Sequence, residues 1–344
     1  MIKIKLTTDS PHWPLIRQTP LSSGIWNDCI FFVNQDVAEC DWWFVYEDLP
    51  KCESAICPQD HVVLITGEPP TFNLYIPEFL DQFSSVISSH VDLPHSSVIV
   101  SQQGLPWHFG VQINSAGEVG DYLTYDEINN FVVEDVKKPK LMSVISSDKT
   151  ISRGHRQRLL FLDKLVSHFG DQIDLFGRGF CEVDDKQKAI APYKYHIVLE
   201  NCSIPHYFTE KLADAFLGWS YPIYYGCPNI LDYFPPASLT PINITDSGRA
   251  IELIETVIDS NLYEKNLPYI STARELVIKK YNVFSTIVGH SQSSKKRGDV
   301  RKLVKLNPQK TNQDVVSRIK RAYNVLNRYG LGKIRRLLLE RYLL

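Results

Sequence analysis

The sequence predicts an α/β protein built from two Rossmann-like domains in tandem. Its 344 residues are enough for two domains that each bury a core of their own. Hydrophobic residues make up 44% of the chain and charged residues 22%, which is typical of globular proteins. Short apolar runs alternate with helical patterns in both halves, and this alternation is typical of parallel sheets flanked by helices.

The first half contains several predicted strands that end before a polar stretch. These strands are Ile2–Leu6, Asp41–Tyr46, Val62–Thr66 and Ser97–Ser101. The sequence KKPK, residues 137–140, precedes a new apolar run. An N-terminal domain is therefore predicted for residues 1–140.

The second half repeats the alternation over residues 141–293, which form the predicted C-terminal domain. Its predicted elements, in chain order, are the strand Leu141–Ser147, the helix Gly154–Phe169, the strand Ile173–Gly177, the strand Tyr195–Leu199, a helix opened by Thr209, an apolar run that ends at Gly226, the strand Ser238–Ile244 and the helix Gly248–Ser260. Open α/β sheets bind ligands beyond the carboxyl ends of their strands. The loops after these strands are therefore the place to look for a site.

Residues 294–344 are predicted to form a basic, amphipathic, helical tail. They hold 15 Lys or Arg and 3 Asp or Glu, whereas the preceding residues hold 22 and 36. Apolar side chains at helical spacing alternate with basic ones in its last part, at Leu331, Ile334, Leu338 and Tyr342. Such a segment can lie on an anionic membrane surface. A helix packed on the body of the protein or on a partner is the alternative.

Several classes of protein are disfavoured by the sequence. No run of 18 apolar residues would span a membrane, and the N-terminus lacks the apolar core of a signal peptide. Seven scattered cysteines suit reduced thiols, so a cytoplasmic location is expected. A nucleic-acid binder is a rival interpretation of the basic tail, but no stacking aromatic pattern or known motif accompanies it.

Thr209, Glu210 and Lys211 open a helix directly after a polar loop. Thr209 can cap the helix, and a lysine in the first turn opposes the helix dipole unless an anion binds there. Backbone N–H groups, the dipole and the ammonium would together make a phosphate site. Glu210 could accept hydrogen bonds from sugar hydroxyls. A surface helix that begins with Glu and Lys is the alternative.

Arg158 and Glu68 are the other two candidates. Arg158 lies on the apolar stripe of its predicted helix, where a buried guanidinium requires a partner such as a pyrophosphate or a structural carboxylate. Glu68 follows an apolar strand between Gly67 and two prolines, so it could act as a general base at a strand end. A solvated loop glutamate is the alternative for Glu68.

The usual phosphate-binding and metal-binding motifs are missing from the sequence. It has no glycine-rich phosphate loop, no GxGxxG fingerprint and no Asp-x-Asp pair. A diphosphate would then be bound by Arg and Lys side chains rather than through a metal bridge. No metal ligand and no cofactor are predicted.

Taken together, these motifs resemble glycosyltransferase family 10, the α1,3/4-fucosyltransferases, and its bacterial members in particular. The most specific match is YKYHIVLENCSIPHYFTEKLADAFLGWSYPIYYG, residues 193–226. Supporting matches in family order are TGEPPTFNLY, KPKLMSVISS, RLLFLDKL and IDLFGRG. Together the matches cover residues from about 60 to 245.

The resemblance implies a GT-B fold, with an N-terminal acceptor domain and a C-terminal domain that binds GDP-fucose. It implies an inverting transfer of fucose to a glycan that needs no metal. The cytosolic character and the basic tail would fit an oligosaccharide or lipid-linked glycan acceptor at the inner membrane, as in the synthesis of bacterial surface polysaccharides. Glu68 would be the base, and Arg158 and Lys211 would hold the diphosphate. The remaining donor contacts would come from Asn201, Tyr207 and Glu210.

Two departures from the family pattern leave alternatives open. Cys202 and Phe208 differ from the residues usual at these positions, and the first sixty residues match no pattern. The rival interpretations are the same scaffold with a different nucleotide-sugar donor, and a non-catalytic protein that binds nucleotide sugars or glycans.

Overall fold

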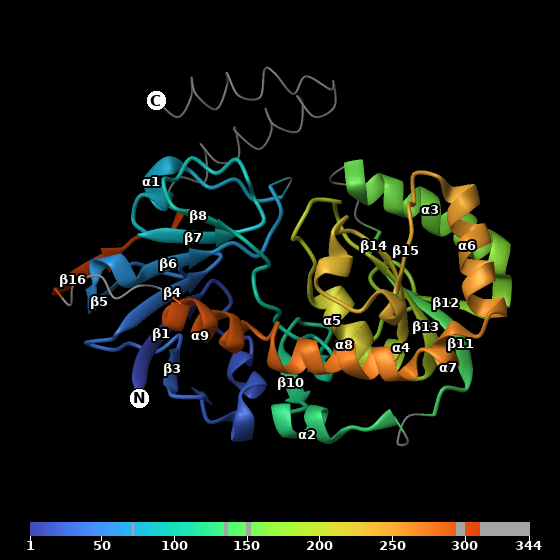
Figure 1. Cartoon of the computed structure of the whole chain (residues 1–344), viewed down its shortest axis with the longest axis horizontal. Coiled ribbons are helices and arrows are strands. Elements are labelled where there is room, and N and C mark those ends of the chain that lie inside the picture. The colour runs from blue at the N-terminus through green and yellow to red at the C-terminus, as the bar shows by residue number, and fades with distance from the viewer. Residues whose placement is uncertain (71, 134–136, 149–152, 294–299, 310–344) are drawn as a thin grey trace, which may run out of the picture. The chain divides into compact units, whose positions relative to one another are not determined.

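The computed structural model describes residues 1–70, 72–133, 137–148, 153–293 and 300–309, and it divides the chain into two compact units (Figure 1). Unit 1 consists of residues 1–11, residues 27–103 and the chain from His290 onward. Unit 2 consists of residues 12–26 and 104–289. Each unit contains a parallel sheet. The predicted α/β class, with a Rossmann-like parallel sheet in each of two units, is confirmed.

The boundaries of the units differ from the predicted boundary at residue 140. Residues 12–26 and 104–140 belong to unit 2 because their polar groups pair with each other. The guanidinium of Arg17 is fully buried and donates hydrogen bonds to the carbonyl oxygens of Trp107 and Phe109, at 2.7 and 3.0 Å. Pairing between segments so far apart in the chain leaves no mark in a local sequence pattern.

The sheet of unit 1 runs through the N-terminal part of the chain. Its parallel strands, in sheet order, are β3 (Cys29–Val33), β1 (Ile2–Thr8), β4 (Trp42–Tyr46), β6 (Val62–Ile65), β7 (Ser85–Ser88) and β8 (Val98–Val100). β6 is buried at every position and β4 at all but its last. Continuous apolar strands of this kind are typical of parallel sheets covered on both faces. One short helix, α1 (Pro77–Leu80), packs its Phe79 and Leu80 into this core.

A second, smaller sheet of unit 1 pairs two segments that lie far apart in the chain. β16 (Arg301–Leu306) pairs antiparallel with β5 (Glu53–Pro58), and Leu306 is buried in the core of unit 1. Residues 301–306 of the predicted helical tail are therefore a strand. The helical part of that prediction lies in residues 310–344, which, like residues 294–299, are outside the described residues.

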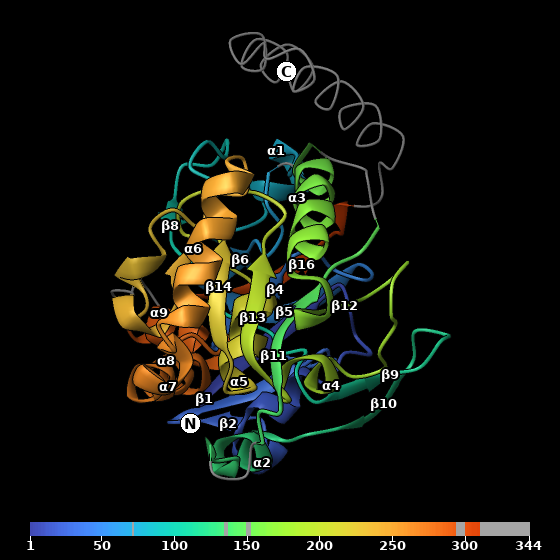
Figure 2. The same ribbon diagram turned by 90° about the vertical axis from the view of Figure 1, so that its right-hand side faces the viewer.

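The sheet of unit 2 has helices on both faces. Its parallel strands, in sheet order, are β12 (Ile173–Phe176), β11 (Lys140–Ile145), β13 (Tyr193–Leu199), β14 (Tyr221–Tyr225) and β15 (Thr240–Pro241). Helices α3 (Arg153–Phe169) and α6 (Ser247–Asp259) cover one face (Figure 2). The other face carries α4 (Lys186–Ile190), α5 (Glu210–Leu217) and α8 (Leu267–Lys279).

The remaining elements of the described chain are short. They are β2 (Ile25–Trp26), the hairpin β9 (Val111–Ile113) and β10 (Val119–Tyr122), and the helices α2 (Tyr125–Asn130), α7 (Leu262–Lys265) and α9 (Val283–Ser293). Single 3-10 turns occupy Leu15–Gln18, Pro20–Ser22, Gln59–His61, Gly170–Gln172, Ile230–Asp232 and Pro236–Ser238. Within the described ranges, no helix combines the length and the apolar character that crossing a bilayer demands.

The bounds of most predicted strands and helices are confirmed to within one or two residues. The predicted helix Gly154–Phe169, for example, is α3. The strand predicted at Ser238–Ile244 is wrong in length, because only Thr240–Pro241 pairs with β14. Four strands of unit 1 were not predicted, namely β3, β5, β7 and β16.

Candidate functional site

A pocket of about 290 Å³ opens at the carboxyl edge of the unit 2 sheet. The order β12-β11-β13-β14-β15 reverses direction between β11 and β13, so the carboxyl ends of these two strands border a topological switch point. Ser146 and Ser147 follow β11, Asn201 follows β13, and all three line the pocket. The pocket therefore lies where open α/β sheets bind their ligands.

Positive charge dominates the lining of this pocket. Among the described residues, its basic side chains are Arg158, Arg178, Lys186 and Lys211, and its carboxylate is Asp214. The cations come from the segments after β11, β12 and β13. A ligand with more than one negative charge, such as a diphosphate, matches this lining.

Arg158 is held at the pocket wall by Asn201. It lies in the first turns of α3 and is only 4% exposed. Its Nη1 donates a hydrogen bond of 2.6 Å to Oδ1 of Asn201, while its Nε has no hydrogen-bond partner among the residues that the structure describes. Burial lowers the pKa of Arg158, and the nearby carboxylate of Glu200 opposes that shift. Because Arg158 lines the pocket, its guanidinium supplies positive charge where a ligand would bind.

Glu200 is a buried anchor for the start of α5. Its carboxylate is 1% exposed and accepts hydrogen bonds from the N–H and the hydroxyl of Thr209, at 2.8 and 2.9 Å. Burial raises the pKa of Glu200, whereas Lys211, with its Nζ 3.4 Å from Glu200 Oε2, favours the ionised form. A Cβ on Gly226 would lie 2.5 Å from the Cγ of Glu200, so this anchor requires glycine at the end of β14.

Lys211 and Glu210 occupy the first turn of α5, as predicted. Thr209 is the N-cap, and its hydroxyl oxygen accepts from the N–H of Lys211 at 3.4 Å. The Nζ of Lys211 lies 3.2 Å from Oε1 of Glu210, and a second cation, Lys186, lies 3.5 Å from the same oxygen. Burial alone would raise the pKa of Glu210, but Lys211 and Lys186 outweigh it and hold this pKa well below its usual range.

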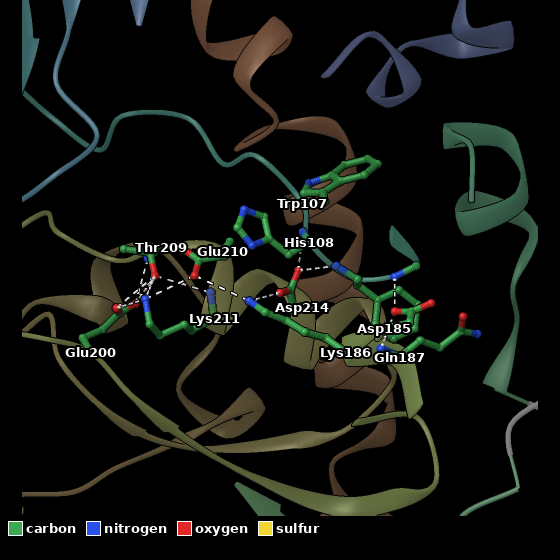
Figure 3. A network of polar contacts seen from close by, with 12 residues as sticks. Trp107, His108, Asp185, Lys186, Gln187, Glu200, Thr209, Glu210, Lys211 and Asp214 are labelled. Carbon is green, nitrogen blue, oxygen red and sulfur yellow. Dashed lines mark hydrogen bonds and ion pairs between the residues drawn. The ribbon is translucent and has the colours of Figure 1, made fainter. Parts of the chain in front are cut away.

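Figure 3 shows this network of polar contacts. The sequence prediction missed three of its residues, namely Lys186, Asp214 and His108. Lys186 pairs with Asp214 at 3.0 Å, and the buried Oδ1 of Asp214 accepts from the backbone N–H groups of His108 and Phe109, both at 2.9 Å. Burial lowers the pKa of His108 to about 4. The one local signal was Asp185, which caps α4 and thereby places Lys186 in its first turn.

One residue that lines the pocket, His196, belongs to a neutral polar pair. Ser143 on β11 and His196 on β13 are directly opposite each other, and their Oγ and Nδ1 atoms are 2.8 Å apart. Burial lowers the pKa of His196 to about 3, so the imidazole is uncharged at neutral pH. The positive charge of the pocket therefore comes from its Arg and Lys side chains and not from His196.

Tyr207 is buried at 2% exposure and, like Glu210, is not among the residues that line the pocket. The predicted contacts of these two residues with a donor stay predictions. In the part of the chain that the structure describes, no three His, Cys, Asp or Glu side chains gather as ligands for a metal ion.

Glu68, the predicted base, belongs to unit 1 and lies beyond the carboxyl end of β6. Its side chain is half-buried. Its N–H donates to the carboxylate of Glu47, and its carbonyl oxygen lies 2.7 Å from Nε2 of His90. The structure thus holds the backbone of Glu68 in place at the end of a buried strand, as the sequence predicted.

Unit 2 is thus a parallel α/β domain with a pocket lined by cations at the switch point of its sheet. Residues 135–266 match the family model described as glycosyltransferase family 10 (fucosyltransferase) C-term. The resemblance seen in the sequence is thus confirmed for residues 135–266.

Two curated relatives match parts of the chain. The α-(1,3)-fucosyltransferase FucT of Helicobacter pylori is 32% identical over 75 residues, which are 22% of this chain and 15% of the relative. An α-(1,4)-fucosyltransferase of Arabidopsis thaliana is 41% identical over 51 residues, which are 15% of this chain and 13% of the relative. The chain thus matches less than a sixth of the length of either relative.

Solved structures match over a larger share of the chain. An α1,3-fucosyltransferase with GDP-fucose covers 82% of this chain and 92% of its own, with 16% identity and a TM-score of 0.46. An α-glucosyltransferase in complex with UDP-glucose and DNA covers 85% of this chain and 98% of its own, with 7% identity and a TM-score of 0.49.

Proposed function

We propose that the protein is an inverting glycosyltransferase that moves fucose from GDP-fucose to a hydroxyl group of a glycan. One observation carries the proposal: four cations line a pocket at the switch point of a domain that matches family 10. The two curated relatives are both fucosyltransferases, and one similar solved structure contains GDP-fucose.

In this reaction the diphosphate is the leaving group and must depart as an anion. As the bond between the anomeric carbon and the diphosphate oxygen breaks, the sugar gains oxocarbenium character and negative charge grows on GDP. Arg158 and Lys211 are placed at the pocket to stabilise that charge. The guanidinium of Arg158, which lines the pocket, can give GDP a charge-assisted hydrogen bond.

The acceptor hydroxyl must lose a proton as it attacks the opposite face of the sugar. Glu68 is the proposed base: its carboxylate takes that proton while the acceptor oxygen bonds to the anomeric carbon. We propose that Asn201, Tyr207 and Glu210 contribute to donor binding, and that the reaction needs no metal.

A donor panel tests the identity of the sugar nucleotide. Purified protein and a glycan array would be offered GDP-fucose, GDP-mannose and UDP-glucose, with products read by mass spectrometry. We expect transfer from GDP-fucose alone. Transfer from another donor would favour the second candidate, the same scaffold with a different nucleotide sugar, which the departures at Cys202 and Phe208 leave open. Donor binding with neither transfer nor hydrolysis would indicate a binding protein.

We further propose a cytoplasmic enzyme that acts on an oligosaccharide or lipid-linked glycan during the synthesis of a bacterial surface polysaccharide. Its basic C-terminal residues would contact the inner face of the membrane. Co-sedimentation with anionic vesicles tests this contact. Full-length protein should bind at low salt, and removal of residues 331–344 should weaken binding. Equal sedimentation of both forms would contradict the membrane role.

A further inference from the structure

Glu47 is a buried carboxylate at the carboxyl edge of the unit 1 sheet. It directly follows β4 and is 8% exposed. Its backbone is left-handed, with φ at +68°, which is uncommon for a residue with a side chain. Both the burial and this backbone conformation are unfavourable, so the contacts of Glu47 must compensate for them.

The carboxylate of Glu47 accepts its hydrogen bonds from the loop that carries Glu68. Oε1 accepts from the N–H of Glu68. Oε2 accepts from Nδ2 of Asn73 at 3.0 Å and from the hydroxyl of Tyr75 at 2.5 Å. Both oxygens are therefore occupied by a single loop, residues 66–76.

Two further contacts fix the backbone of this loop, one from His90 and one at Gly67. His90 lies 2.7 Å from the carbonyl oxygen of Glu68, so both peptide groups of Glu68 are fixed. A Cβ on Gly67 would lie 2.8 Å from Oε1 of Glu47 and 2.9 Å from Cε1 of Tyr46. Glycine at position 67 is thus required by the close approach of Glu47.

We propose that Glu47 is the positioning residue for the general base, fixing the backbone of Glu68 so that its side chain meets the acceptor hydroxyl in one orientation. This inference rests on the proposed role of Glu68. Because Glu47 is buried and both its oxygens already accept hydrogen bonds, it acts through Glu68 and not on the acceptor.

The variant Glu47→Gln tests the inference with almost no change in volume. A glutamine amide has one acceptor oxygen and one NH₂ donor. Its NH₂ group would therefore lie against another donor, either the N–H of Glu68 or the side-chain NH₂ of Asn73. We expect kcat to fall roughly 10- to 100-fold, the loss typical of a misplaced catalytic group. The KM for GDP-fucose and the Kd for GDP should each stay within about twofold of the wild-type value.

A double-mutant cycle separates positioning from an independent role. In a Glu68→Gln background, Glu47→Gln should cause almost no further loss, because the group that it positions is gone. Wild-type kcat in Glu47→Gln, or an equal fold-loss in both backgrounds, would overturn the inference. A near-wild-type rate in Glu68→Gln alone would instead overturn the proposed base.

Tyr75→Phe serves as the second variant if Glu47→Gln fails to fold. It removes one donor to Glu47 and keeps the ring, so kcat should fall in the same direction by a smaller factor. Tyr221→Phe is the matched control, because its buried hydroxyl pairs with Thr240 in unit 2 at 2.9 Å, away from the pocket lining. The control should keep wild-type kcat, and thermal unfolding would verify folding. A folded Tyr75→Phe protein with wild-type kcat would count against the inference.

Discussion

The two units share a strand order but carry opposite chemistry at its edge. In unit 1, β3 lies on one side of β1, and β4, β6, β7 and β8 follow on the other side. In unit 2, β12 lies on one side of β11, and β13, β14 and β15 follow on the other side. Beyond the carboxyl ends, unit 1 places the carboxylates of Glu47 and Glu68, while unit 2 places the cations Arg158 and Lys211. The sheet thus determines where a site lies, and the residues just after the strands determine what it does.

That division matches the two halves of the proposed reaction. A carboxylate is suited to take a proton from an acceptor, and buried cations are suited to receive the charge of a leaving diphosphate. If the comparison is right, substituting the carboxylates of unit 1 should slow transfer without weakening GDP binding. Substituting the cations of unit 2 should slow transfer and also weaken GDP binding.

Glu68→Gln should have the largest effect. The amide keeps the shape of the side chain but cannot accept the proton, so kcat should fall by about 10²–10⁴-fold. The Kd for GDP, measured by calorimetry, should stay at the wild-type value. A variant that keeps more than half of the wild-type rate at saturating acceptor would place the base elsewhere.

Arg158→Ala and Lys211→Ala should come next. Each removes one charge-assisted contact to the diphosphate, so each should weaken GDP binding by roughly 1.5–3 kcal/mol and also slow transfer. Lys279→Ala is the matched control, because Lys279 pairs with Glu275 on the exposed surface of α8 in the same unit. Unchanged GDP affinity in both pocket variants would break the comparison.

The uncharged His196 of the unit 2 pocket predicts a smaller, pH-dependent effect. The pKa of His196 falls from the ordinary value of 6.5 to about 3 in the folded protein, so the unfolded chain binds more protons between these values. The free energy of unfolding is therefore full above pH 6.5 and decreases as the pH is lowered, by about 2 kcal/mol at pH 5 for this group. Urea unfolding of wild type and His196→Asn at pH 7 and pH 5 would measure it. An equal pH dependence in both proteins would contradict a neutral, buried imidazole.

Chelation should have the smallest effect. If Arg158 and Lys211 stabilise the diphosphate, EDTA should leave the rate of transfer nearly unchanged. Complete loss of activity, restored only by added metal, would show that the cations of unit 2 do not suffice.

The sequence predicted the parts of the site that directly follow a strand or open a helix. Lys211 and Glu68 were singled out in this way, because the end of an apolar run marks the edge of a sheet. Asn201 was expected from the family resemblance, and it lines the pocket beside Arg158. Lys186 and His108 were missed because α4 is only five residues long and His108 precedes an irregular hairpin, so neither has a periodic pattern. Their meeting depends on Asp214, a helical residue whose partners lie far away in the chain.

Glu47 shows a signal that was present but not used. Like Glu68, it is a carboxylate directly after a buried strand of unit 1. Its left-handed backbone and its three donors depend on a loop that begins nineteen residues later, so its role required the folded structure. β16 was missed for another reason: its alternating Leu, Val and Lys residues lie within a basic segment whose charge dominated the prediction.

The pairing of β16 with β5 has a consequence for the order in which the protein is made. Unit 1 contains strands from both ends of the chain, so the ribosome must deliver residues up to about 309 before its second sheet can close. Unit 2 is complete by Gly289, so its core can form first although most of unit 1 emerges earlier. A released chain that ends at residue 290 should therefore protect unit 2 from protease while β5 stays cleavable. A truncated expression clone would best end after Gln309, whose backbone N–H donates to Asp48 at 2.9 Å, because a clone that ends at Ser293 lacks a strand of unit 1.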